Sequence, residues 1–348
     1  MTTTYSLGWD IGGAHLKAAV INPDGIIIDI FQQPCPLWKG LATLHAAVNA
    51  VLQALPDAHY RHAITMTGEL VDLFDGRDEG VRQIIATMER LLLDAGMLVF
   101  AGKHGLLPHH QITAAHYPDI ASANWLASAG FAAQTVGEGM FIDIGSTTTD
   151  VLVLKAGNVQ VQGYTDYQRL ISKELVYTGI VRTAVMAVAQ TATDEGHEIG
   201  LMAEYFATMA DVYRVTGELN EAHDQTDTAD GAEKTPQASA RRLARMIGCD
   251  FYPGQLPRWQ AFAHNLRGQQ VQKIRLACEQ LSVNSGLSAN APIIGAGIGR
   301  FLAQQLAGQW ARPYLDFSRL CQSSATTPNA ADCAPAVAVG YLNHHLKQ

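Results

Sequence analysis

The chain has 348 residues, which suits two domains or one large one, and 48% of its residues are hydrophobic. Its net charge of −8 and pI of about 5.9 exclude the basic face that a nucleic-acid-binding protein needs. No signal peptide and no apolar run of about 18 residues is apparent, so we expect no membrane association. Five scattered cysteines without a C-x-x-C pair indicate free thiols in a reducing cytoplasm.

The first residues predict a three-stranded antiparallel sheet. Strands are expected over residues 4–11, 15–22 and 26–31, since the second alternates with period two and a turn signal precedes the third. The first strand ends near Asp10, and glycines follow it in the string GWDIGGAHLKAAV, residues 8–20. Glycine lets the backbone turn sharply and approach a ligand, and successive N–H groups in such a turn suit phosphate oxygens.

Helices and strands alternate after this sheet. The pattern predicts helices over 40–54 and 79–95 and strands over 62–67 and 97–101. Small residues in 118–133 predict a helix that packs closely against another. Four histidines precede this helix: His104, His109, His110 and His116. No pair of them has i, i+4 spacing with an acid nearby, so we interpret them as surface or hinge histidines, with a metal site as the alternative.

A second hairpin repeats the design of the first. The string FIDIGSTTTDVLVL, residues 141–154, reads as strand, turn and strand, with Asp143 at the end of its first strand. Each Asp-Ile-Gly triplet begins about one domain's length of chain. An ordinary hairpin is the alternative for either turn taken alone. Together, the two predict one anionic ligand held from both sides of a cleft.

The second half is predicted to be mainly helical, over residues 177–215, 238–248 and 257–287. Residues 221–237 are polar and rich in Asp and Thr, which predicts either a mobile surface loop or a lid that a ligand orders. Asp211 is a candidate base or substrate-binding residue. The alternative is that Asp211 and Arg214 form a helical i, i+3 pair on a solvated face.

A glycine-rich motif, PIIGAGIGRFLA, residues 292–303, runs from a strand into a helix. Its bare backbone and helix N-terminus suit an adenosine or phosphate group. Because Asp316 follows at a suitable distance, a dinucleotide site is an alternative, but the spacing G-x-G-x-G departs from G-x-G-x-x-G.

The paired hairpins resemble those of the superfamily of actin, sugar kinases and heat-shock ATPases. The resemblance implies an α/β fold of two ribonuclease H-like domains that flank a central cleft. It implies a first domain over residues 1–135, completed by the C-terminal helix 331–348, and a second over 136–330. The helix within 118–133 and the final helix would cross between them.

Four local strings narrow this resemblance: MTGEL (66–70), YTGIVRTAV (177–185), EYFATMADVYRVTGEL (204–219) and RRLARMIGCD (241–250). They resemble hydantoinase/oxoprolinase-type proteins linked to tetrahydromethanopterin one-carbon metabolism, and within that group the synthases of methanofuran and methylofuran assembly. Such a synthase joins an aminomethyl-furanmethyl diphosphate to the phenol of a glutamyl-tyramine. The product is an aryl ether, and diphosphate is released.

That reaction needs charge neutralised on its leaving group and a base for the phenol. Asp10 and Asp143 are the expected ligands of Mg²⁺, with Asp143 favoured as the base, Glu69 second and Asp10 the third catalytic candidate. The phosphate-binding candidates are Gly12, Gly13, Lys17, Gly145, Ser146 and Thr147. The nucleotide-like or substrate-binding candidates are Gly295, Gly297, Gly299, Arg182 and Asp211.

Several readings remain open at this point. The synthase consumes an activated diphosphate, so the sequence leaves the use of ATP open. An ATP-dependent hydantoinase/oxoprolinase-like hydrolase or a small-molecule kinase is the alternative enzyme, and a non-catalytic actin-like nucleotide switch is the alternative of another class. The expected partner is a phosphorylated small molecule, and a homodimer is an alternative to a monomer.

Overall fold

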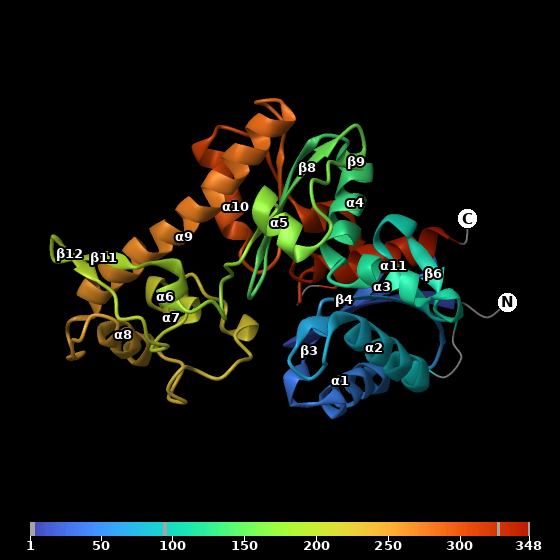
Figure 1. Ribbon diagram of the computed structural model, residues 1–348, viewed down its shortest axis with the longest axis horizontal. Helices are drawn as coiled ribbons and strands as arrows, with labels where there is room; N and C mark the ends of the chain where they lie inside the picture. The colour runs from blue at the N-terminus through green and yellow to red at the C-terminus, as the bar shows by residue number, and fades with distance from the viewer. Residues whose placement is uncertain (1–3, 93–95, 326–327, 347–348) are drawn as a thin grey trace.

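The computed structural model describes residues 4–92, 96–325 and 328–346, and it has a mixed α/β fold (Figure 1). Its two main sheets have the strand orders β15-β3-β2-β1-β4-β5-β6 and β10-β8-β7-β13-β14, with β9 beside β8. The expected α/β class is therefore confirmed. No helix in the described ranges is long and apolar enough to cross a bilayer.

The first sheet begins with the predicted antiparallel strands β1 (Thr4–Ile11), β2 (His15–Ile21) and β3 (Ile26–Pro34). It continues through β4 (His59–Met66), β5 (Leu98–Phe100) and β6 (Leu106–Pro108), and β15 (Gln322–Ser323) pairs with its outer edge at β3. Helices α1 (Leu41–Ala54) and α2 (Arg77–Leu92) share one hydrophobic core with β1 and β4.

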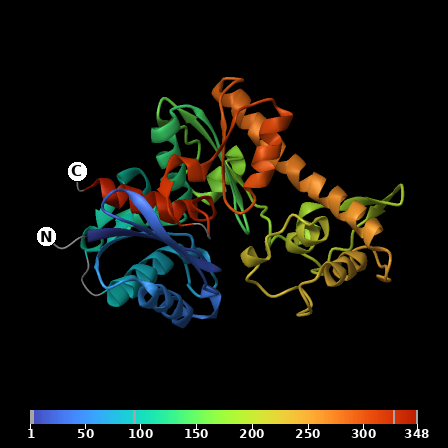
Figure 2. The same ribbon diagram turned by 180° about the vertical axis from the view of Figure 1, so that it is seen from behind.

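The last helix, α11 (Ala334–His345), packs on β1, β2 and β4 of this first sheet. Gly8 makes the close approach possible, because a Cβ there would lie 2.0 Å from the carbonyl oxygen of Ala336. Helix α11 also contacts α4 (Asn124–Val136), so these two helices lie between the sheets (Figures 1 and 2). Their small residues permit this packing.

The second sheet contains β7 (Gly139–Ile144), β8 (Thr149–Lys155), β9 (Asn158–Val159), β10 (Leu175–Val176), β13 (Ile293–Ala296) and β14 (Tyr314–Asp316). Its β7 and β8 side chains alternate between two cores, as period two requires. One core is shared with α9 (Leu256–Ser285) and α10 (Arg300–Gln309), and the other with α4 and α11. The short helices α3 (Tyr117–Ile120) and α5 (Asp166–Ser172) flank the region between the sheets.

A further lobe lies apart from both sheets, around one end of α9 (Figure 1). It contains α6 (Val185–Val188), the hairpin of β11 (Thr191–Asp194) and β12 (His197–Gly200), α7 (Met209–Thr216) and α8 (Pro236–Arg245). The prediction that 177–215 is mostly helical was wrong. Glu195 and Gly196 both have positive φ, which forms the tight turn between β11 and β12.

Candidate functional site

The two hairpin turns line the same cleft, which has a volume of about 610 Å³. Its lining includes Gly12, Gly13 and Ala14 from the turn after β1, and residues 146–148 from the turn after β7. The sequence prediction that both turns face one ligand-sized space therefore agrees with their positions. Gly145 itself is not among the lining residues, although the three residues that follow it are.

The two turns are built alike. The Gly12 N–H donates to the His15 carbonyl oxygen at 2.9 Å, and the Gly145 N–H donates to that of Thr148 at 2.8 Å. Within the described ranges, no acceptor is found for the next two N–H groups of either turn, at Gly13 and Ala14 and at Ser146 and Thr147. Ser146 Oγ is buried and also has no partner there. Unpaired donors from both walls make the cleft suitable for an anion.

Different partners stand opposite the two hairpin aspartates. In the first hairpin Asp10 pairs in register with Lys17, and in the second Asp143 pairs with Asp150. Burial, followed by repulsion from Asp150, raises the pKa of Asp143 to about 7, against the attraction of Lys17. Burial also raises the pKa of Asp10, although Lys17 opposes it. Asp10, Lys17 and Asp150 line the cleft directly, whereas Asp143 lies behind that lining.

Lys17 is fixed by the C-terminal part of the chain. Its Nζ donates to the Asp332 carbonyl oxygen at 2.6 Å, and Asp332 lies in the 3-10 helix η8 (Ala330–Cys333). Burial favours the neutral amine, but Cys333 and then Asp10 and its neighbouring carboxylates outweigh it and raise the pKa of Lys17. The cleft therefore holds a charged ammonium group whose position depends on residues 315 positions away.

Asp150 is ion-paired with Arg169 on α5, at 2.6 Å. The Arg169 guanidinium lies 4.0 Å from the centre of the Trp125 ring, an arrangement typical of a cation–π contact. Burial raises the pKa of Asp150, and Arg169 opposes that rise. Because Arg169 is already engaged by two side chains, its main role in the cleft is to oppose the rise in the pKa of Asp150.

Arg182 is placed at the second turn. Its Nη1 donates to Thr147 Oγ1 at 3.4 Å. Its guanidinium lies 5.3 Å from the ring centre of Trp38, which also lines the cleft. No ion pair of Arg182 is found among the described residues. Burial, and then the charges of Lys17 and Arg182, lower the pKa of nearby His15 to about 4, so His15 adds no positive charge at neutral pH.

Glu69 is almost fully buried and is not among the residues that line the cleft. Ser122, which lines the cleft, donates its hydroxyl to Glu69 Oε1 at 2.7 Å, and burial raises the pKa of Glu69 to about 7. Arg77 of α2 and Asp166 of α5 form an ion pair at 2.5 Å close to this hydrogen bond. This ion pair joins α2 to α5 beside the cleft, which Asp166 lines.

The glycine-rich motif packs against the second hairpin. A Cβ at Gly297 would lie 2.4 Å from Asp143 Oδ1, and one at Gly299 would lie 2.4 Å from the Ile144 side chain. Gly295 makes a similar approach to the Tyr314 ring. None of these three glycines is among the residues that line the 610 Å³ cleft.

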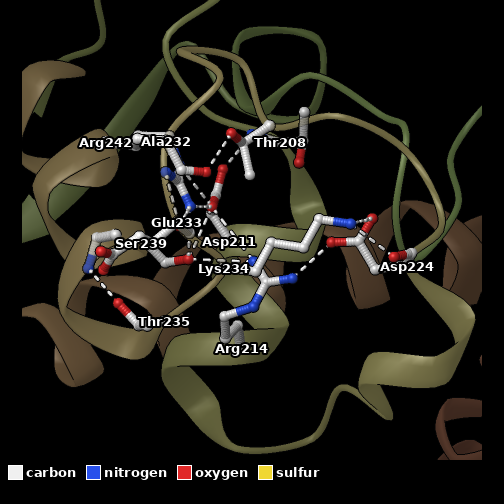
Figure 3. Close-up of polar contacts among 12 residues, drawn as sticks. Thr208, Asp211, Arg214, Asp224, Ala232, Glu233, Lys234, Thr235, Ser239 and Arg242 are labelled. Carbon is white, nitrogen blue, oxygen red and sulfur yellow. Dashed lines mark hydrogen bonds and ion pairs between the residues drawn. The ribbon is translucent and has the colours of Figure 1, made fainter.

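Asp211 and Arg214 form the expected i, i+3 pair, with 3.5 Å between Oδ1 and Nη1, but both are buried, so the expectation of a solvated face was wrong. Asp211 Oδ1 accepts hydrogen bonds from Ser239 and Arg242, and its Oδ2 accepts from the Thr208 N–H (Figure 3). Both oxygens of Asp211 are thus engaged inside the further lobe, as a structural carboxylate would be.

The polar segment 221–237 is held by the same network. Arg214 binds Asp224 at 2.5 Å, and Lys234 donates to the Asp224 carbonyl oxygen at 2.6 Å (Figure 3). Its 3-10 turn η6 (Glu221–His223) brings His223 Nε2 to 3.5 Å from Asp332 Oδ2. Although burial opposes them, His223 and then Arg300 hold the pKa of Asp332 at about 2. The segment therefore reaches from the further lobe to the element that positions Lys17.

The arrangement of these side chains gives partial support to a metal site. No group of three His, Cys, Asp or Glu side chains with metal-ligand spacing occurs in the described ranges, and this includes the histidines around His109. Mg²⁺, however, is commonly held by one or two carboxylates together with substrate phosphates and waters. Asp10, with the unpartnered Ser146 Oγ nearby in the same cleft, fits such a site.

Several residues of the cleft were missed by the sequence reasoning. One of them, Asp150, could have been found, because the internal repeat places it where the first hairpin has Lys17. The others come from distant segments that only folding brings together: Trp38, Ser122, Asn124, Trp125, Asp166, Arg169 and Tyr177.

Comparison with known proteins agrees with this architecture. Over 97% of its length the chain superposes on a nucleotide-free acetone carboxylase structure, with a TM-score of 0.58, 12% identity and coverage of 70% of that chain. It is 33% identical over 245 residues to (4-{4-[2-(gamma-L-glutamylamino)ethyl]phenoxymethyl}furan-2-yl)methanamine synthase of Methanocaldococcus jannaschii, covering 70% of this chain and 72% of the relative. The protein of the same name from Methanococcus vannielii is 28% identical over 35% of this chain and 55% of the relative. The hydantoinase/oxoprolinase family model matches residues 61–321. The chain therefore belongs to the hydantoinase/oxoprolinase family.

Proposed function

We propose that the chain is a transferase-type synthase of one-carbon-carrier biosynthesis of the methanofuran or methylofuran type. It joins an aminomethyl-furanmethyl diphosphate to the phenol of a glutamyl-tyramine and releases diphosphate. The name of the Methanocaldococcus jannaschii relative describes a phenoxymethyl-furan, which is the aryl ether that this reaction forms.

One observation of the site carries the proposal. The N–H groups of Gly13 and Ala14, after β1, and of Ser146 and Thr147, after β7, have no acceptor among the described residues, and these four residues line a single cleft. A diphosphate has oxygens enough to engage both turns at once. Donors that are already oriented toward the leaving group stabilise the charge that develops on it, without reorganisation. The cationic side chains Lys17 and Arg182 lie in the same cleft and add to this effect.

The bond changes are simple. The phenol oxygen forms a bond to the methylene carbon of the furan substrate, and the bond from that carbon to the diphosphate oxygen breaks. The diphosphate leaves with the electron pair, and the phenol proton passes to a base. Two buried carboxyls, Asp143 and Glu69, have a pKa raised by burial to about 7, so each could take a proton from an attacking phenol near neutral pH.

Asp10 and Asp143 are the proposed holders of Mg²⁺, which when bound would neutralise charge on the diphosphate. The role of ATP stays open. An ATP-dependent hydrolase or a small-molecule kinase is the alternative, supported by the fold of the acetone carboxylase structure. A cytoplasmic location is part of the proposal, supported by the five cysteines, all of which are free thiols.

The test is direct. The purified protein is incubated with the furanylmethyl diphosphate, γ-glutamyltyramine and Mg²⁺, and the ether is sought by mass spectrometry while released diphosphate is assayed. Lys17→Met should lose the activity, and Lys103→Met, a change at an exposed lysine, should keep it. Absence of the ether, with robust ADP release from ATP alone, would contradict the synthase and favour the alternative.

A further inference from the structure

Ser122 has an unusual backbone conformation. Its φ is 51°, in the left-handed region that non-glycine residues seldom adopt, and its side chain is almost fully buried. Such a strained conformation often occurs at functional sites. In this conformation the Ser122 hydroxyl lies between the cleft, which it lines, and Glu69, to which it donates at 2.7 Å.

Glu69 has an unused acceptor. Its Oε1 accepts from Ser122, but its Oε2 is buried and has no partner within the described ranges. A carboxylate buried with an unsatisfied oxygen is costly, and no ion pair to Glu69 is found among the described residues to compensate for it. The described hydrogen bonds make Ser122 the link between Glu69 and the cleft.

We propose that Ser122 receives the proton of the phenol acceptor and passes its own hydroxyl proton to Glu69, so that Ser122 and Glu69 together form the base of the reaction. This inference rests on the proposed function. As the phenol O–H bond breaks, that proton moves to Ser122 Oγ, and the original Ser122 proton moves to Glu69 Oε1. The phenol oxygen bonds to the methylene carbon, and diphosphate leaves with the electron pair.

The contacts around Ser122 distinguish between two possible proton acceptors, Glu69 and Asp166. Ser122 Oγ also lies 3.4 Å from Asp166 Oδ2, but that oxygen is already ion-paired with Arg77 at 2.5 Å. The ion pair with Arg77 occupies this Asp166 oxygen, and the hydrogen bond from Ser122 to Glu69 Oε1 is shorter, at 2.7 Å, so Glu69 is the acceptor. Around Glu69, burial is the largest influence and raises its pKa to about 7, Ser122 and Arg77 oppose that rise, and Asp166 adds to it.

The relay is tested with Ser122→Ala and Glu69→Gln in the full-length protein. Each should lower kcat for ether formation between about 100- and 10,000-fold, the usual contribution of a positioned base. KM for the diphosphate substrate should stay unchanged, because neither side chain belongs to the two turns. The wild-type kcat should fall as the pH drops below about 7, and this decline should be absent in Glu69→Gln.

A more acidic phenol separates a base from a structural group. Replacing the ordinary phenol, with a pKa of about 10, by a ring-substituted acceptor that ionises near neutral pH should restore much of the lost rate in both variants. Glu79→Gln and Ser285→Ala, at positions outside the cleft, are the matched controls and should behave as wild type. Thermal melting and diphosphate binding show whether each variant folds.

Equal losses of kcat with both phenols, or a wild-type kcat in Ser122→Ala, would overturn the relay. Ether formation by the wild-type protein would still support the synthase in that case. No ether from the wild-type protein would overturn the synthase and the relay together.

Discussion

Asp143 and Asp150 face each other as register partners in the second hairpin, at the position where the first hairpin pairs Asp10 with Lys17. The two hairpins thus share a backbone and differ in charge. Two adjacent carboxylates cannot both ionise without compensation. Arg169 supplies it for Asp150, at 2.6 Å, and Asp143 is left with a raised pKa beside the cleft.

The pairing of Arg169 with Asp150 predicts a pH-dependent loss of stability in Arg169→Met. Removing one partner of a buried ion pair costs about 3–5 kcal/mol. Without Arg169 the pKa of Asp150 should rise further above its ordinary value. In the folded state Asp150 would then keep its proton up to a higher pH than in the unfolded chain. The loss should therefore be small near pH 4 and grow as the pH rises, which urea unfolding at several pH values would show. A cost that is independent of pH would contradict this account.

Asp143→Asn, which removes a proposed Mg²⁺ ligand, should abolish ether formation and at the same time change the pH profile of stability. The folded carboxyl keeps its proton up to a pH of about 7, whereas the ordinary pKa is 3.8, so its contribution to stability is lost as the pH rises between these values. The unfolding free energy of Asp143→Asn relative to wild type should therefore increase from pH 4 to pH 8. Wild-type turnover in this variant would remove Asp143 from the mechanism.

The two turns should respond differently to an added methyl group. At Gly12 a Cβ would lie 2.9 Å from the His15 carbonyl oxygen, whereas at Gly145 the nearest atom, the Thr148 oxygen, is 3.4 Å away. Gly12→Ala must therefore shift its turn, and we expect a loss of diphosphate affinity of about tenfold, or roughly 1.4 kcal/mol. Gly145→Ala should change the affinity for diphosphate less. Calorimetry of diphosphate binding gives both values, and equal effects would show that the turn geometry is not decisive.

The buried network of the further lobe predicts a contrast between two carboxylates that share Arg214. Asp211→Asn removes a charge that is almost fully buried, and we expect a loss of about 3 kcal/mol in unfolding free energy. Glu221→Gln removes one that is 51% exposed, and the loss should stay below about 1 kcal/mol. Denaturant unfolding compares the two, and a larger effect at Glu221 would mean that Arg214 depends on the surface pair.

Local patterns in the sequence were sufficient for the three strands that begin the first sheet, the two strands of the second hairpin, the glycine turns and most long helices. Alternation, turn residues and helical periodicity act over a few neighbouring positions, so they can be read without the fold. The same reading overestimated helix in 177–215, because the Glu195-Gly196 turn and its short strands carry little periodicity.

The sequence by itself determined the two Asp-Ile-Gly turns and, through their repetition, the idea of one anion held between two domains. Only the tertiary structure decided which side chains surround that anion. Ser122, Arg169 and Lys17 acquire their roles from Glu69, Asp150 and Asp332, which lie 53, 19 and 315 positions away. Burial, which raises the pKa of Glu69 and Asp143 to about 7, is likewise a property of the packed molecule and of no local string.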